Sequence, residues 1–244
     1  MNNFQKVEQN VGIKVHSSTH PIDSFKALSG TYVNLYPLNL IQNIEELARD
    51  LFPLKITDEF ISSFTYLPYD APTSIEDLSY KLSSQFGTQG YIYYVIRIAK
   101  KPVGWIALMN IGLDDGVVEI GNVYFSADLK RSRAATEVLF LLLNECFTLG
   151  FRRIEWKCHE LNLASKKAAL RFGFQYEGMF RQHKVVKGRN RNTLWFSMLD
   201  EEWLTLKESY LAWLEPSNFT QEGQQIKTLQ VFIKKNQRKL NKAR

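Results

Sequence analysis

The residues best suited to chemistry lie between Glu119 and Phe174. A strand that ends near Ser126 is followed by Arg-Ser-Arg-Ala-Ala-Thr at 131–136 and then by a long apolar helix. The N–H groups of such a turn and the positive end of the helix dipole face the same point, where they can hold an anion. A strand, a turn of small and basic residues and a helix start therefore predict a pyrophosphate site.

A second candidate segment begins at Asn162. A strand at 153–158 precedes Asn-Leu-Ala-Ser at 162–165, which opens a helix that ends at Phe172-Gly-Phe174. Asn162 is a good N-cap for this helix, and Ser165 lies about one turn further along it. Because a cap needs no catalytic role, the spacing alone leaves the function of both residues open.

Common catalytic motifs are absent from the sequence. It has no Gly-x-x-x-x-Gly-Lys-Ser/Thr loop, no Gly-x-Gly-x-x-Gly, no Gly-x-Ser-x-Gly elbow and no His-Glu-x-x-His. We expect no metal site, since the sequence has only the histidines His16, His20, His159 and His183. Cys146 and Cys158 have no metal-like spacing and are expected to be reduced core residues of a cytoplasmic protein.

The elements that position these residues follow from hydrophobic periodicity. Strands are predicted at 32–40, 91–99, 103–111, 117–125, 153–158, 175–181 and 193–199, and helices at 41–52, 74–86, 134–149, 163–172 and 204–214. An antiparallel meander thus runs into an alternating β/α half. This order predicts an α+β fold: a mixed, mostly antiparallel central sheet flanked by helices, with one parallel crossover pair in the half that holds the anion site.

Composition and charge divide the chain into a single domain, 1–220, and a basic tail, 221–244. The 45% hydrophobic content suffices for a packed core, and no apolar run approaches the roughly 20 residues that span a bilayer. The N-terminus has no apolar signal segment. The formal net charge of +6 belongs to the tail, so residues 1–220 sum to zero and do not indicate a strongly charged substrate.

Four motifs, in this order, resemble the GNAT superfamily of acetyl-CoA-dependent N-acetyltransferases: Glu119-Ile-Gly121, Arg131-x-Arg-Ala-Ala-Thr-Glu137, Asn162-x-x-Ser165 and Gly173-Phe174. Tyr66-Leu-Pro-Tyr69 and Gly188-x-x-Arg191-Asn-Thr193 are similar to the branch with the ribosomal-protein-alanine N-acetyltransferases. The resemblance covers residues 32–203 and leaves 204–214 as an additional helix. It implies a GNAT fold and acetyl transfer from acetyl-CoA to a primary amine by direct attack in a ternary complex.

The resemblance also implies which residues contact coenzyme A. The pyrophosphate turn corresponds to Arg131, Ser132, Arg133, Ala134, Ala135 and Thr136. Because this chain has Arg131 and Arg133 where the family usually has glycines, we expect both at negative φ, with at least one pairing with phosphate. The strand containing Val123, Tyr124 and Phe125 is expected to splay from the strand after Phe174 and to hold the pantetheine arm and the thioester carbonyl with free amides.

The implied catalytic residues are Glu119 and Ser165. Glu119 matches a carboxylate that many members use as general base, which is needed because an amine is mostly protonated at neutral pH and attacks only when neutral. A structural Glu paired with an Arg is the equal alternative. Asn162 is expected near the cofactor. Ser165 is the candidate to protonate the departing thiolate, directly or through water, since the family's usual tyrosine position is Ala169.

Other functions stay open. The same fold could be a non-catalytic acyl-CoA-binding module, or the basic tail could contact RNA or the ribosome, although a solvated end is the simpler interpretation. Protein N-termini, lysines, polyamines, amino acids and aminoglycoside-like compounds are all compatible acceptors. The helix at 204–214 could bury a surface of a second copy. Side chains expected near the acceptor cleft are Tyr66, Tyr69, Trp105, Tyr176, His183 and Trp195, with core packing as the simpler role for the aromatic ones.

Overall fold

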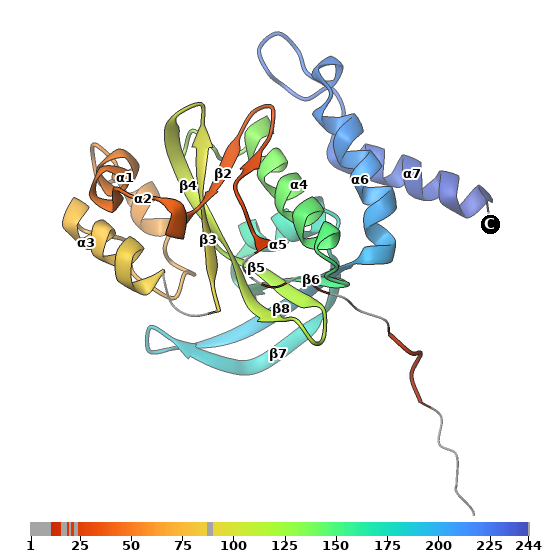
Figure 1. The fold of residues 1–244 in the computed structure, drawn as a ribbon, viewed down its shortest axis with the longest axis horizontal. Coiled ribbons are helices and arrows are strands. Elements are labelled where there is room, and N and C mark those ends of the chain that lie inside the picture. The colour runs from red at the N-terminus through yellow and green to blue at the C-terminus, as the bar shows by residue number, and fades with distance from the viewer. Residues whose placement is uncertain (1–10, 16–18, 20, 22–23, 87–89, 244) are drawn as a thin grey trace, which may run out of the picture.

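The computed structural model describes residues 11–15, 19, 21, 24–86 and 90–243, so the N-terminal segment 1–10, His16 and His20 lie outside the description. The described chain forms one eight-stranded sheet in the order β1-β2-β3-β4-β5-β6-β8-β7 (Figure 1). Every neighbouring pair is antiparallel except β5 and β6, which are parallel. The α+β fold with one parallel pair confirms the prediction.

The strands are β1 (Leu28–Ser29), β2 (Asn34–Pro37), β3 (Ile92–Ile98), β4 (Lys101–Gly112), β5 (Val117–Phe125), β6 (Arg153–His159), β7 (Gln175–Val186) and β8 (Arg189–Leu199). The helices are α1 (Ile44–Leu51), α2 (Asp58–Ser62), α3 (Ile75–Tyr80), α4 (Arg133–Thr148), α5 (Leu163–Arg171), α6 (Asp200–Leu214) and α7 (Leu229–Ala243). Short 3-10 turns at Leu38–Leu40 and Pro216–Asn218 and a π-helical turn at Lys81–Gln85 complete the elements.

Most differences from the predicted elements lie at ends and in short pieces. The strand predicted at 32–40 is shortened because a 3-10 turn follows Pro37. The helix predicted from residue 41 begins at Ile44, since the Asn43 side chain accepts a hydrogen bond from the Glu46 amide and caps the helix there. Neither β1 nor α2 was predicted, because pieces this short carry little periodicity.

The two faces of the sheet carry separate cores because side chains alternate along each strand. Tyr94, Ile106 and Ile120 belong to the larger core with α4, α6 and α7. Tyr93, Trp105 and their neighbours Ala107 and Tyr124 pack with α1 and α3 in a second core. Figure 1 shows α1–α3 grouped on one side of the sheet and α6 and α7 at the opposite end of the molecule. The parallel pair β5–β6 lies between these two helical layers.

Glu137 ties the start of α4 to the N-terminal turn. Its carboxylate is 5% exposed and accepts hydrogen bonds from the amides of Thr31, Tyr32 and Val33 at 2.8, 2.6 and 2.9 Å. A Cβ at Gly30 would lie 2.5 Å from that carboxyl group, so a larger residue there would displace the carboxylate from these bonds. Three charge-assisted bonds to one buried carboxylate hold the helix start in a fixed position.

Part of the C-terminal segment packs against the fold. Residues 221–244 were expected to be a basic tail, yet Leu229 and Ile233 of α7 belong to the larger core, and α7 packs along α6. The charge count concealed this apolar stripe because Lys and Arg occupy several of the other helix positions. Within the described part of the chain, no helix has the length and apolar character that crossing a membrane requires.

Candidate active site

An opening passes through the sheet where β5 and β6 diverge. Their parallel pairing runs from Val117 opposite Arg153 to Ile120 opposite Trp156 and stops there. Beyond this point β5 stays paired with β4, and β6 stays paired with β8. The prediction that the 122–125 strand splays from the strand after Phe174 named the wrong neighbour, because that strand, β7, lies at the edge of the sheet.

A β-bulge shapes the wall of this opening. The β4–β5 register shifts between Trp105 opposite Tyr124 and Ala107 opposite Gly121, and Asn122 takes a positive φ of 48°. The Asn122 side chain donates a hydrogen bond of 2.7 Å to the Tyr93 hydroxyl, which stabilises this uncommon backbone conformation. A bulge bends and twists the strand, so the amides that follow it are re-aimed on the side facing the opening.

The turn before α4 is built to present free N–H groups. Ser132 caps the helix, and its hydroxyl accepts a hydrogen bond of 3.0 Å from the Ala135 amide. The first amides of a helix lack intrahelical acceptors, which leaves those of Arg133 and Ala134 available to an anion. The expectation of negative φ throughout was wrong for Arg131, whose φ is +59°, so an arginine occupies a conformation that glycine adopts more easily.

Two arginines beside this turn are each held by one hydrogen bond and by an aromatic ring of residues 213–219. The Arg133 guanidinium donates to the Tyr32 hydroxyl at 2.6 Å and stacks 3.3 Å from the centroid of the Phe219 ring. The Arg171 guanidinium donates to the Thr136 hydroxyl at 3.0 Å and lies 5.2 Å from the Trp213 ring centroid. Desolvation lowers the pKa of Arg171, and neither arginine forms a salt bridge with a described residue.

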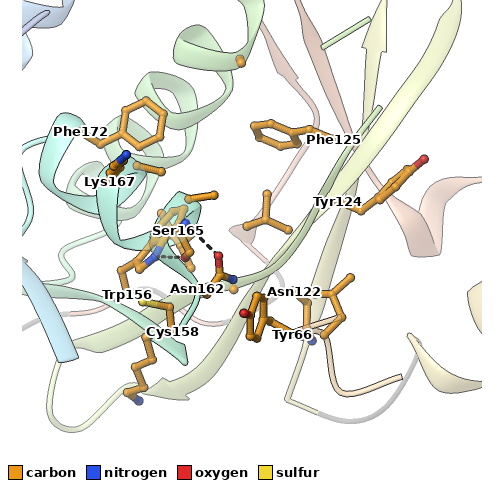
Figure 2. A pocket seen from close by; sticks show the side chains of 18 of the residues that line it. Tyr66, Asn122, Tyr124, Phe125, Trp156, Cys158, Asn162, Ser165, Lys167 and Phe172 are labelled. Atoms are coloured by element: carbon orange, nitrogen blue, oxygen red, sulfur yellow. Dashed lines mark hydrogen bonds between the residues drawn. The ribbon is translucent and has the colours of Figure 1, made fainter. Parts of the chain in front are cut away.

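These features line one cleft of about 1700 Å³ that continues through the opening between β5 and β6. In Figure 2, Trp156, Cys158 and Ser165 lie on one side, and Tyr124 and Phe125 of β5 lie on the other. The cleft brings together the residues expected to bind cofactor or catalyse, except Ala134, whose side chain packs in the core. The lining includes eight Lys or Arg side chains and two carboxylates, Glu59 and Glu119. The zero net charge of residues 1–220 therefore conceals a basic cleft.

Glu119 lines the cleft one residue before the β5–β6 pairing ends. It alternates with the core residues Val118 and Ile120, so its side chain points to the face opposite α4. It is 5% exposed, and its Oε2 accepts hydrogen bonds from Lys157 Nζ at 2.8 Å and Asn110 Nδ2 at 2.6 Å. Within the described chain, no donor is bonded to its Oε1, which faces Gly121. The ion pair expected as an alternative exists, with a lysine in place of an arginine.

Lys157 connects Glu119 to a second carboxylate. Its Nζ lies 2.8 Å from Glu155 Oε2 as well, and 3.9 Å from the centroid of the Trp195 ring. Glu155 lies directly opposite Glu119 in the parallel register, and Lys157 is two residues further along the same strand, so all three point to one face. Lys157 thus bridges two carboxylates, and Arg153 Nε, 2.9 Å from Glu155 Oε1, pairs with the second of them. Among the described residues, only Glu119 of these two carboxylates lines the cleft.

Ser165 faces the opening from the other side of the sheet. Asn162 caps α5 and accepts a hydrogen bond of 3.0 Å from the Ser165 amide, as shown by a dashed line in Figure 2. The Ser165 Oγ accepts the Trp156 indole N–H at 2.9 Å, which leaves the hydroxyl proton free to be donated. Burial raises the pKa of the nearby Cys158 thiol, so that thiol is protonated and a poor nucleophile at neutral pH.

The aromatic residues divide between cleft and core. Tyr66 and Trp195 line the cleft, and the Tyr66 hydroxyl donates to the Leu161 carbonyl at 3.1 Å. Trp105 and Tyr69 instead hydrogen-bond each other at 3.1 Å within the second core. His183 lines the cleft, whereas Tyr176 of β7 is 51% exposed and is not among the residues that line it.

Sequence reasoning did not identify several residues of the cleft. Lys157 could have been found, since alternation along β6 places it on the face of the neighbouring Glu119. Trp213, Phe219 and Gln225 also line the cleft, although they follow the segment in which the motifs lie. No local pattern marks their role, because the packing of α6 against α4 brings this segment beside the cleft.

Comparison with known proteins identifies the family. A family model described as an acetyltransferase (GNAT) domain matches residues 40–175. The crystal structure of a GCN5-related N-acetyltransferase from Brucella melitensis is 41% identical, with a TM-score of 0.83, covering 88% of this chain and 97% of that one. The chain therefore belongs to the GNAT family of acetyltransferases and is an acyltransferase.

Further comparisons agree. A GNAT-family structure from Chromobacterium violaceum is 35% identical, with a TM-score of 0.69, covering 82% of this chain and 98% of that one. An acetyltransferase from Salmonella typhimurium that modifies the N-terminal serine of ribosomal protein L7/L12 is 18% identical, with a TM-score of 0.57, covering 71% and 99%. At that identity the likeness concerns the fold alone. No curated protein sequence matches the chain.

A metal is not indicated in the described part of the chain, where no three His, Cys, Asp or Glu side chains are grouped to hold one.

Proposed function

We propose that this protein transfers the acetyl group of acetyl-CoA to a primary amine by direct attack in a ternary complex. The observation that carries the proposal is the opening between β5 and β6, which joins a groove at the start of α4 to a cleft that holds Glu119 on the opposite face. Acetyl-CoA would supply an activated acyl group from the α4 side. The amine would then approach from the face of Glu119 and meet it in the opening.

The groove residues suit the phosphates of coenzyme A. The free amides at the start of α4 and the side chains of Arg131, Arg133 and Arg171 converge on one end of the cleft. We place the pantetheine arm along Val123–Phe125, whose outer amides lack a neighbouring strand. Trp213 and Phe219 would then border the nucleotide end, beyond the pyrophosphate.

Glu119 is placed to receive the proton of the amine. Its Oε1 faces the cleft side of Gly121 and has no donor among the described residues, so it can accept a proton directly or through one water. Lys157 on Oε2 keeps the carboxylate fixed in orientation and compensates its charge. The neutral nitrogen then forms a bond with the acyl carbon as the carbon–sulfur bond breaks.

Ser165 is placed to donate a proton to the departing sulfur. Its hydroxyl is oriented by the Trp156 indole, which occupies the oxygen as an acceptor and leaves the proton free. The position where other family members carry a tyrosine is the buried Ala169 in this chain, so no tyrosine can donate the proton from there. A covalent route through Cys158 is disfavoured because that thiol is buried and its pKa is raised.

Two measurements test this function. Titration calorimetry at low salt should detect binding of coenzyme A, and thiol release should depend on both acetyl-CoA and an added amine. Binding without amine-dependent thiol release across an amine panel would favour a non-catalytic acyl-CoA-binding module. Absence of binding would refute the proposal.

A further inference from the structure

A pair of cations lies on the acceptor side of the cleft. Lys184 of β7 and Arg191 of β8 are directly opposite each other in the antiparallel register, and both line the cleft. Like charges in directly opposed positions destabilise a sheet. Among the described residues neither forms a salt bridge, and the remaining lysine nearby, Lys157, is already paired with Glu119 and Glu155.

Arg191 is held in place, but most of its donors are unused. Its Nε donates to the Thr193 hydroxyl at 3.2 Å, and this buried hydroxyl also lies 3.0 Å from His183 Nδ1. The other guanidinium nitrogens donate to no described residue. Desolvation lowers the pKa of Arg191, while the negative charge of Glu119 opposes that shift. A half-buried guanidinium with free donors faces the same space as the proposed base.

Trp195 adds a further unused donor to this wall. Its indole Nε1 is buried and has no hydrogen-bond partner among the described residues, although the ring lines the cleft. Burial and the charges of Lys184, Arg191 and Lys157 lower the pKa of His183, which favours the neutral imidazole. The wall therefore offers several donors and few acceptors to a bound molecule.

We propose that Arg191 and Lys184 bind a carboxylate of the acceptor and so place its amine beside Glu119. The inference deepens the proposed function and rests on it. A planar guanidinium matches a carboxylate with two parallel hydrogen bonds, and the opposed lysine adds a second charge. The acceptor class is then an amine that carries a nearby carboxylate, either a free amino acid or a peptide with an acidic residue close to its N-terminus.

The same cations disfavour acceptors with several positive charges. Polyamines and aminoglycoside-like compounds would bring additional ammonium groups towards Lys184, Arg191 and Lys157. A single acceptor amine gains from this field, because nearby positive charge favours its neutral, reactive form. The basic wall thus disfavours polycationic acceptors and also favours the neutral form of a single acceptor amine.

Matched acceptor pairs test the inference. A free amino acid is compared with its carboxamide, and an N-terminally free peptide with acidic second and third residues is compared with its Asn/Gln counterpart. We expect kcat/KM to favour the carboxylate by about ten- to hundredfold, as for one charge-assisted bidentate contact. The pair that shows this ratio identifies the source of the carboxylate. Equal rates within both pairs would overturn the inference and leave the acetyl-transfer function intact.

Variants locate the contact. Arg191→Gln should reduce the carboxylate preference at least tenfold, and Arg191→Lys should retain part of it. Arg189→Gln, at an exposed position of the same strand outside the cleft, is the matched control and should retain the full ratio. Unchanged affinity for coenzyme A shows that each variant is folded. If Arg191→Gln fails to fold, Lys184→Gln at an exposed position serves as the test. An undiminished preference for the carboxylate acceptor in that variant would refute the proposed carboxylate contact.

Discussion

The proposed role of Glu119 makes a measurable prediction about catalysis. Glu119→Gln keeps the size of the side chain and one oxygen acceptor, but it removes the charge and the basic site. General-base catalysis contributes about 10²–10⁴-fold. The carboxylate is 5% exposed and has few alternatives nearby, so we expect kcat to fall by about 10²–10³, or ~2.7–4 kcal/mol in the barrier.

The structure supplies a matched control for this variant. Glu155 pairs with the same Lys157 at the same distance of 2.8 Å, yet it does not line the cleft. Each substitution leaves Lys157 with one carboxylate partner and changes one further contact, with Asn110 for Glu119 and with Arg153 for Glu155. We expect each to cost ~1–2 kcal/mol of stability. If catalysis depends on Glu119 as a general base and not on the ion pair with Lys157, Glu155→Gln should keep kcat within a few-fold of the wild type.

The assay is thiol release at saturating acetyl-CoA, with coenzyme A affinity measured separately by calorimetry. Glu119→Gln should bind coenzyme A almost as tightly as the wild type, because its side chain lies on the opposite face from α4. Equal loss of kcat in Glu119→Gln and Glu155→Gln would show that the ion pair, and not a base, was removed. A kcat within threefold of the wild type for Glu119→Gln would refute the assignment.

Three further perturbations follow from individual contacts. Phe219→Ala should weaken binding of coenzyme A by about three- to tenfold, because the ring stacks on the Arg133 guanidinium. Binding of acetyl-pantetheine should stay unchanged. Equal losses of affinity for both ligands in calorimetry would contradict this. Glu137→Gln should lower the free energy of unfolding by about 3–5 kcal/mol in urea titrations, since three amides lose one buried, charged acceptor, and a loss below ~1 kcal/mol would contradict this. The Arg153 guanidinium lowers the pKa of Glu177, so this stabilisation is complete above the carboxyl's unfolded value of about 4.3 and disappears as pH falls through the lower folded value. Arg153→Gln should therefore be less stable than the wild type at pH 7 and approach it near pH 3, and a pH-independent difference in urea midpoints would argue against the coupling.

The sequence by itself determined much of the architecture around the site. Apolar periodicity located β5, α4, β6 and α5, because each is long enough for its pattern to be distinct. Ser132 and Asn162 act as helix caps through local hydrogen bonds, and such bonds depend only on nearby residues. For the same reason the turn that we propose binds an anion could be located before its place in the fold was known.

Only the tertiary structure decided what surrounds each of these residues. The pairing of Glu119 with Lys157 and Asn110 depends on the register of three strands, and a shift of one residue would turn those side chains to the other face. The stacking of Phe219 on Arg133 depends on α6 packing against α4, which joins segments far apart along the chain. Local patterns do not encode such contacts, because long-range packing sets which residues from distant segments meet. The chain's own periodicity therefore shows where the cleft begins, and packing decides which charges line it.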